Sequence, residues 1–259
     1  MQAVILAGGY GTRLSEETTV RPKPMVEIGG MPIIWHIMKT YASHGINDFI
    51  ICCGYKGEVI KEYFWKYSLY ASDVTIDLRD PNNEIQIHQR TTEPWKITMV
   101  DTGLKTLKGG RIRRIRDYLE GDTFCLTYGD GVSDINITDL VSFHNGHNAL
   151  VTLTAVQTKG RFGAFKLAGD STEVRDFREK PTTDAAWING GYFVVDRKAV
   201  DYIGDDSTDW EIGPLEVLSK EGNLQAFKHT DFWHPMDTLN DKNALETMWQ
   251  NDEAPWKVW

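Results

Sequence analysis

The sequence has few of the features that mark several large protein classes. Only 3 of its 259 residues are cysteine, which is too few for a disulfide framework. Cys52 and Cys53 are adjacent and Cys125 stands alone in another apolar run, so they form no CxxC metal motif and we interpret them as small buried hydrophobic residues. The histidines also lack the spacing of a zinc motif. A protein built on disulfides or on structural zinc is therefore not expected.

Positive charge and long apolar runs are also scarce. The chain carries 28 lysines and arginines against 37 aspartates and glutamates, a net charge of -9, whereas general nucleic-acid binding needs a basic surface. No apolar stretch approaches the roughly 20 residues of a membrane span, and the opening MQAVILAGG has no basic region before its apolar residues. We therefore expect a cytoplasmic protein with no nucleic-acid or membrane partner, in which any phosphate site is local.

Strand and helix patterns alternate along the first half of the chain. Short apolar runs at Ala3–Leu6, Phe49–Cys53 and Thr123–Tyr128 predict buried parallel strands, and apolar positions three and four residues apart predict helices between them. This alternation predicts an α/β fold with a Rossmann-like, mostly parallel mixed sheet and helices on both faces. Such sheets bind their ligands at the carboxyl ends of the strands.

The second half of the chain is richer in strand patterns. We interpret residues 1–148 as a nucleotide-binding half and residues 149–259 as a smaller, β-rich acceptor-binding half. No repeat or low-complexity linker separates the two halves. Residues 1–259 are therefore expected to form a single domain, which is a usual size for one large α/β unit.

The first predicted strand leads into a glycine-rich loop, LAGGYGTRL at 6–14. Missing side chains let backbone amides approach phosphate oxygens. However, Leu14 occupies the third glycine position of the dinucleotide fingerprint, and the Gly-Lys-Ser/Thr end of a P-loop is absent. The glycines by themselves are as typical of a strand-end turn as of a phosphate site.

Two cations make this loop a candidate triphosphate site. Arg13 lies inside the loop, and Lys23 follows ten residues later between Pro22 and Pro24. The prolines stiffen the chain on both sides of the lysine. A guanidinium suits paired phosphate oxygens, and a compact ammonium suits the charge that develops during phosphoryl transfer.

Two distant carboxylates are candidates for a metal site. Asp130 lies between glycines in TYGDG at 127–131, and Asp237 lies in PMDTL at 235–239. Each aspartate alone is more often a turn residue. Because Mg²⁺ binds through one or two carboxylates together with substrate phosphates, the two aspartates and the candidate triphosphate loop together indicate a Mg²⁺ site.

These motifs, taken in order, resemble the sugar-1-phosphate nucleotidyltransferases. LAGGYGTRL and RPKPM carry the general resemblance, and further blocks are similar to the glucose-1-phosphate cytidylyltransferase group: SEET, VEIGG, IICCGYKG, TYGDG, GRFGA, INGG and PMDTL. The resemblance implies transfer of CMP from CTP to α-D-glucose 1-phosphate, with CDP-glucose and pyrophosphate as products. It further implies a homo-oligomer, with a hexamer as one candidate, and a role in making deoxysugars for surface polysaccharide such as the O-antigen of lipopolysaccharide.

The resemblance also implies roles for particular residues. Its catalytic residues are Arg13, Lys23 and Lys180, and its Mg²⁺ ligands are Asp130 and Asp237. The implied nucleotide-binding residues are Leu6, Ala7, Gly8, Gly9, Tyr10, Gly11, Thr12, Arg13, Lys23, Thr106, Arg111 and Gly129. The implied sugar-phosphate-binding residues are Gly163, Glu179, Lys180 and Asn189.

One position departs from the family pattern. Lys108 stands before Gly109 and Gly110, where a small hydroxyl residue is more usual. The resemblance implies that this segment lies near the base. A nucleotidyltransferase that uses dTTP or UTP in place of CTP, or a different phosphorylated acceptor, therefore stays an alternative. A non-catalytic nucleotide-sensing subunit on the same fold is a second alternative, which the retention of Arg13 and Lys23 disfavours.

Overall fold

The computed structural model spans residues 1–259 and describes all of them except 80–84, 91, 158–163, 168–173 and 179–185. Its centre is a seven-stranded sheet with the strand order β14-β10-β13-β8-β1-β4-β7. The strands are β1 (Gln2–Ala7), β4 (Asp48–Cys53), β7 (Lys96–Asp101), β8 (Thr123–Tyr128), β10 (Val151–Val156), β13 (Ile188–Asp196) and β14 (Leu224–His229).

The sheet is mixed but mostly parallel. β1 pairs in parallel with both β4 and β8, β4 with β7, and β10 with β14. Only β13 runs against its neighbours β8 and β10 among these seven strands. The predicted fold class is therefore confirmed, and the apolar runs predicted as strands coincide with β1, β4 and β8 within about two residues.

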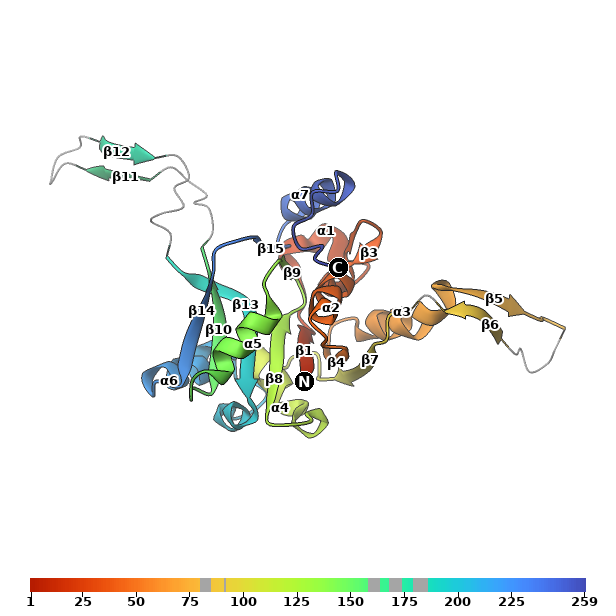
Figure 1. Ribbon diagram of the computed structural model, residues 1–259, viewed down its shortest axis with the longest axis horizontal. Helices are drawn as coiled ribbons and strands as arrows, with labels where there is room; N and C mark the ends of the chain where they lie inside the picture. Colours follow the sequence, from red (N-terminus) through yellow and green to blue (C-terminus); the bar gives the residue numbers. More distant parts are fainter. Residues whose placement is uncertain (80–84, 91, 158–163, 168–173, 179–185) are drawn as a thin grey trace.

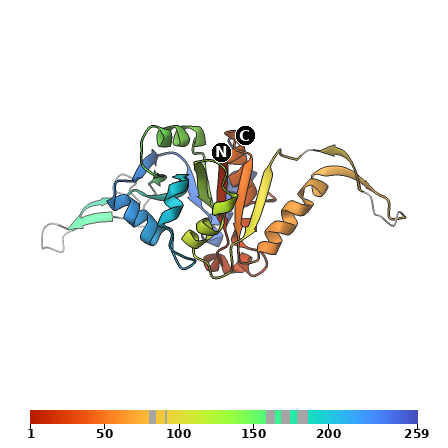
Figure 2. The ribbon, with the colours of Figure 1, turned by 90° about the horizontal axis from the view of Figure 1, so that it is seen from below.

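Helices cover both faces of the sheet, because alternate residues of each strand point to opposite sides (Figures 1 and 2). Ala3 and Ile5 of β1 belong to one hydrophobic cluster, and Val4 and Leu6 belong to another. On the first face lie α2 (Ile33–Ser43) and α5 (Ile137–Asn145), and on the second lie α4 (Lys108–Arg114) and α6 (Glu216–Lys220).

A short two-stranded ribbon links distant parts of the chain at one end of the sheet. β9 (Gly131–Ser133) pairs antiparallel with β15 (Trp233–Pro235), and Figure 1 shows them near α1 (Ser15–Thr18). Two further hairpins lie away from the sheet in Figure 1. They are β5 (Ser72–Ile76) with β6 (Ile85–Arg90), which follow α3 (Gly57–Tyr70), and β11 (Ala164–Leu167) with β12 (Val174–Arg178).

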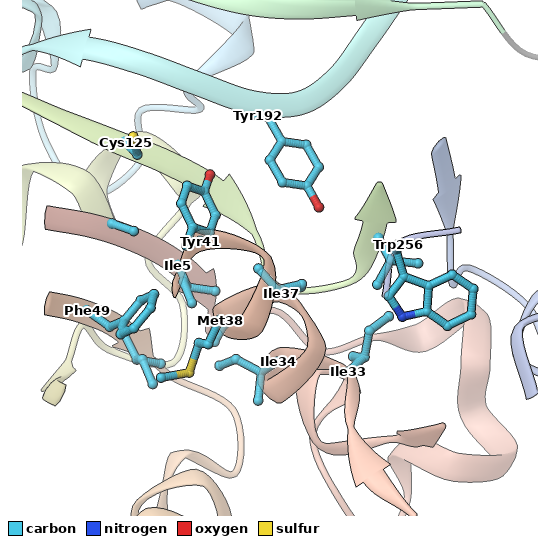
Figure 3. Packing of buried hydrophobic residues seen from close by; sticks show 14 of the residues in the cluster. Ile5, Ile33, Ile34, Ile37, Met38, Tyr41, Phe49, Cys125, Tyr192 and Trp256 are labelled. Carbon is cyan, nitrogen blue, oxygen red and sulfur yellow. The ribbon is translucent and has the colours of Figure 1, made fainter. Parts of the chain in front are cut away.

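The tryptophan-rich end of the chain packs on the body of the protein. It follows α7 (Leu239–Gln250), and Trp256 is fully buried beside Ile33 of α2 (Figure 3). The indole of Trp256 also donates a hydrogen bond to His36 Nδ1 over 3.3 Å. Burial lowers the pKa of His36 to about 4, so this imidazole is neutral near pH 7 and can accept that bond.

Replacing Trp256 should therefore destabilise the whole domain. We expect Trp256→Ala to lower the free energy of unfolding by about 3–5 kcal/mol, because it removes a large buried side chain and leaves a cavity. Chemical denaturation monitored by circular dichroism measures the change. Val258→Ala is the control, since Val258 is 42% exposed. Equal losses from the two variants would show that the C-terminal segment does not contribute to the core.

Candidate active site

A cavity of about 460 Å³ opens at the carboxyl ends of β1 and β8, the edge at which a ligand was expected. Every residue predicted to bind the nucleotide lies on its wall. The lining residues are Leu6, Ala7, Gly8, Gly9, Tyr10, Gly11, Thr12, Arg13, Lys23, Pro24, Leu104, Lys105, Thr106, Leu107, Lys108, Arg111, Tyr128, Gly129, Asp130 and Asp209. Its volume lies within the usual range of small-molecule sites.

The glycine loop owes its shape to two of its glycines. Gly11 has φ of 64°, a left-handed conformation that favours glycine. At Gly8 a Cβ atom would lie only 2.0 Å from the Arg111 guanidinium, so any larger residue there would displace this side chain from its present position. The remaining glycine of the loop, Gly9, has no atom within 4 Å of the position a Cβ would take, so its backbone borders open space.

Lys23 lies at the centre of the site and bridges both predicted metal-binding carboxylates. Its Nζ lies 2.7 Å from Asp130 Oδ2 and 2.7 Å from Asp237 Oδ1. The lysine begins a 3-10 turn (Lys23–Met25) directly after Pro22, and its side chain is only 8% exposed. Arg13 contacts the same group, since its Nη1 lies 2.7 Å from Asp237 Oδ2.

The short ribbon explains how two aspartates so far apart in sequence meet. Asp130 lies between β8 and β9, and Gly131 of β9 is paired with Pro235 of β15. The Met236 amide then donates a hydrogen bond to the Asp130 carbonyl over 2.8 Å. Asp237 therefore follows directly from a strand whose register is set by the residues next to Asp130.

Arg111 has a structural role in the site. Its guanidinium is buried and donates to the carbonyl oxygens of Gly8 (2.9 Å), Cys53 (3.2 Å) and Gly103 (2.9 Å) and to Thr102 Oγ1 (2.7 Å). Gly8 follows β1, Cys53 is the last residue of β4, and Thr102 and Gly103 follow β7. Burial lowers the pKa of Arg111 from its ordinary value, but a guanidinium stays charged in proteins. Arg111 thus joins the carboxyl ends of three neighbouring strands at one edge of the sheet.

A second, smaller cavity of about 170 Å³ adjoins the first. It is lined by Arg13, Thr127, Tyr128, Asp130, Gly131, Gly190, Gly191, Tyr192, Trp233, Pro235 and Asp237. Arg13, Tyr128 and Asp130 border both cavities. Two substrates bound in the two cavities would therefore meet at the group formed by Lys23 and the aspartates.

The structure places the predicted sugar-phosphate residues only in part. Asn189 lies next to the second cavity, where its Nδ2 donates to the Tyr128 hydroxyl over 3.1 Å and its Oδ1 accepts from the Gly191 amide over 2.9 Å. Gly163, Glu179 and Lys180 lie outside the described residues. Their roles stay predictions.

Known proteins of similar sequence identify the family of this chain. A family model described as nucleotidyl transferase matches residues 2–235. The glucose-1-phosphate cytidylyltransferase of Salmonella typhi is 54% identical over 260 residues, covering 100% of both chains, and the probable glucose-1-phosphate cytidylyltransferase of Bacillus subtilis (strain 168) is 43% identical over the same full lengths. The chain belongs to the nucleotidyl transferase family.

Solved structures support the fold of this nucleotidyltransferase independently. The crystal structure of HddC from Yersinia pseudotuberculosis has a TM-score of 0.68 at 21% identity and covers 96% of this chain and 99% of its own. A putative glucose-1-phosphate thymidylyltransferase from Bacillus anthracis has the same TM-score at 18% identity, over 96% of this chain and 94% of its own. The family resemblance and the enzyme class predicted from the motifs are therefore confirmed.

The nucleotidyltransferase family generally uses a divalent metal, and the donor set of this site fits one. Asp130 and Asp237 direct carboxylate oxygens at a common point, now held by Lys23 Nζ. No cluster of three or more potential ligands occurs in the part of the chain that the structure describes. Two carboxylates alone suit an ion that takes its other ligands from water and substrate phosphates.

Among the helices that the structure describes, none is long and apolar enough to cross a membrane.

Sequence reasoning missed one group at the site. Lys108 Nζ lies 2.5 Å from Glu211 Oε2 and 3.6 Å from Asp209 Oδ2, and the Tyr128 hydroxyl donates to Glu211 Oε1. The only signals in the sequence were the unusual Lys108 and the tyrosine in TYGDG. Nothing in the spacing of the chain connects these residues with Glu211.

Removing the Arg111 guanidinium should destabilise the nucleotide cavity. We expect Arg111→Met to lower the free energy of unfolding by about 2–4 kcal/mol, since it removes the charged hydrogen bonds that Arg111 donates to the carbonyl oxygens of Gly8, Cys53 and Gly103. It should also raise the KM for the nucleoside triphosphate, because the glycine loop loses its support. Arg113→Met, at an exposed position of the same helix, is the matched control. If both variants unfold at the same denaturant concentration, Arg111 does not tie the loops together.

Proposed function

We propose that this chain transfers CMP from CTP to α-D-glucose 1-phosphate, giving CDP-glucose and pyrophosphate. The identity of 54% and 43% to glucose-1-phosphate cytidylyltransferases over the full chain supports this activity. The observation that carries it is the position of Lys23, which joins Asp130 and Asp237 where the two cavities meet. Charge neutralisation is therefore concentrated at the point where two phosphate groups must approach each other.

In this proposal the larger cavity takes CTP and the smaller one takes the sugar phosphate. Backbone amides of the Gly8–Arg13 loop face the triphosphate, and Thr106 and Arg111 border the nucleoside. Glu179 and Asn189 are proposed to hold sugar hydroxyls, and Lys180 the phosphate of the acceptor. The roles of Gly163, Glu179 and Lys180 rest on the family resemblance alone.

The reaction is a displacement at the α-phosphorus of CTP. A phosphate oxygen of glucose 1-phosphate forms the new P–O bond, and the bond from the α-phosphorus to the bridging oxygen breaks, so that pyrophosphate leaves with the electron pair. No general base is needed because the sugar phosphate is already ionised near pH 7. Arg13 and Lys23 offset the repulsion between the reacting anions, and alignment in adjoining cavities lowers the entropic part of the barrier.

Asp130 and Asp237 would hold Mg²⁺ in this proposal. The ion would supply positive charge to phosphate oxygens of the nucleotide. In the structure, Lys23 pairs with both carboxylates and Arg13 pairs with Asp237. The same lysine and arginine are then available to phosphate groups once the carboxylates bind a cation.

The biological setting follows from the resemblance alone. We propose that the enzyme works in the cytoplasm as a homo-oligomer, with a hexamer as one candidate, and supplies CDP-glucose for deoxysugars of surface polysaccharide such as O-antigen. No nucleic-acid or membrane partner is part of this proposal.

A substrate panel tests the activity. We expect pyrophosphate release with CTP and glucose 1-phosphate to have kcat/KM at least about 100-fold above that with UTP or dTTP, and activity to disappear with a chelator and return with Mg²⁺. Comparable rates with UTP or dTTP would favour the nucleotidyltransferase of different base specificity. Triphosphate binding without turnover of any sugar phosphate would favour a nucleotide-sensing subunit.

Lys23 provides a direct test of the catalytic centre. We expect Lys23→Met to lower kcat about 100- to 1,000-fold, because the buried ammonium supplies charge at the reacting phosphates. Lys66→Met, in an exposed pair with Glu62 on α3, should retain full activity. Turnover of the Lys23 variant within a few-fold of the parent would remove this lysine from the mechanism.

A further inference from the structure

Tyr128 forms the wall between the two cavities. It lines both of them and directly precedes Gly129 and Asp130 at the end of β8. Its ring packs edge-on against Phe193 with centroids 5.8 Å apart. On another side lies Gly191, with φ of 80°, where a Cβ atom would be only 2.7 Å from the tyrosine ring. The position of this ring therefore affects the shape of both cavities.

The hydroxyl of Tyr128 links groups on opposite sides of this wall. It donates to the Glu211 carboxylate and accepts from Asn189 Nδ2. Asn189 in turn accepts from the Gly191 amide, and Gly190 and Gly191 line the smaller cavity. A continuous chain of hydrogen bonds thus runs from Glu211 to the backbone of the acceptor side.

Lys108 forms an ion pair with Glu211, where this series of hydrogen bonds begins. Its Nζ lies 2.5 Å from Glu211 Oε2 and 5.7 Å from the centre of the Tyr128 ring. Lys108 lines only the larger of the two cavities, and its side chain is 41% exposed. Burial raises the pKa of Glu211, whereas the nearby ammonium of Lys108 acts in the opposite direction. The lysine therefore stabilises the carboxylate that orients Tyr128.

We propose that Lys108 and Glu211 are positioning residues that act through Tyr128, so that a lysine on the nucleotide side sets the geometry of the acceptor side. The inference rests on the proposed function, in which the smaller cavity takes the sugar phosphate. Hydrogen-bonded networks in a low-dielectric site have demanding geometry, and small displacements of a bound reactant reduce its rate of reaction strongly.

The experiment is a double-mutant cycle on Tyr128→Phe and Lys108→Met, read as the KM for glucose 1-phosphate at saturating CTP. Tyr128→Phe removes only the hydroxyl, so we expect it to raise this KM about tenfold and to leave the KM for CTP within about twofold. Lys108→Met should raise the acceptor KM about fivefold in the parent, and should have no further effect on it once Tyr128→Phe is in place.

Two matched controls separate this network from general effects of the substitutions. Tyr202→Phe removes a tyrosine hydroxyl that donates to Glu221 over 2.7 Å outside both cavities, and Lys66→Met removes a surface ion pair. Both should retain the parent KM values. Glu211→Gln keeps an acceptor oxygen for Tyr128 but loses the charge that pairs with Lys108. It should therefore raise the KM for glucose 1-phosphate as much as Lys108→Met does. Adding Lys108→Met to Glu211→Gln should not raise this KM further.

The proposal is wrong if Lys108→Met changes only the KM for CTP, or if it raises the acceptor KM by the same factor with and without the Tyr128 hydroxyl. The thermal unfolding of each variant is measured as well. If Tyr128→Phe does not fold, a double-mutant cycle of Glu211→Gln with Lys108→Met takes the place of the first cycle. Failure of the parent to use any sugar phosphate is a different result, because it overturns the proposed function itself.

Discussion

The ion pairs of Lys23 with Asp130 and Asp237 are the interaction on which the rest of the site depends. Two carboxylates at one point repel each other, and a largely buried ammonium offsets that repulsion while leaving both oxygens directed at the cavity. The fold meets this requirement with stiff elements. Lys23 follows Pro22, Asp130 lies between β8 and β9, and Asp237 follows β15, which is paired with β9. The fold itself therefore holds these charges in position, which is the condition for electrostatic catalysis.

A second constraint acts on the backbone. At the carboxyl ends of β1, β4 and β7, Arg111 donates hydrogen bonds to the carbonyl oxygens of Gly8, Cys53 and Gly103. The guanidinium occupies the space that a side chain at Gly8 would need. The glycine therefore serves packing on an arginine as well as access of the loop to phosphate. A larger residue at Gly8 would therefore require Arg111 to move and to lose some of its hydrogen bonds.

The sequence predicted the central strands and the loop well, because buried parallel strands are continuous apolar runs and the glycines follow one of them directly. Proline on both sides also marked Lys23 as unusual. The pairing of β9 with β15 could not be predicted, since three-residue strands have no periodicity and their partners are far apart in the chain. The hydrogen bonds of Arg111 to carbonyl oxygens could not be predicted either, because every residue has a backbone carbonyl and the sequence does not show which of them accept. The sequence marked Lys108 only as a departure from the family pattern, and it did not indicate that Glu211 is its partner.

That departure has a physical consequence for specificity. A hydroxyl residue at this position would offer one neutral group, whereas Lys108 brings a charge that needs a carboxylate nearby, and Glu211 and Asp209 provide it. The carboxylate of Glu211 then also accepts from Tyr128, whose ring borders the space for the second substrate. One unusual residue on the nucleotide side is thus connected, through a single tyrosine, with the side that selects the acceptor. If Lys108 acts through Tyr128 as we propose, binding of the acceptor depends on a residue that lines the nucleotide cavity.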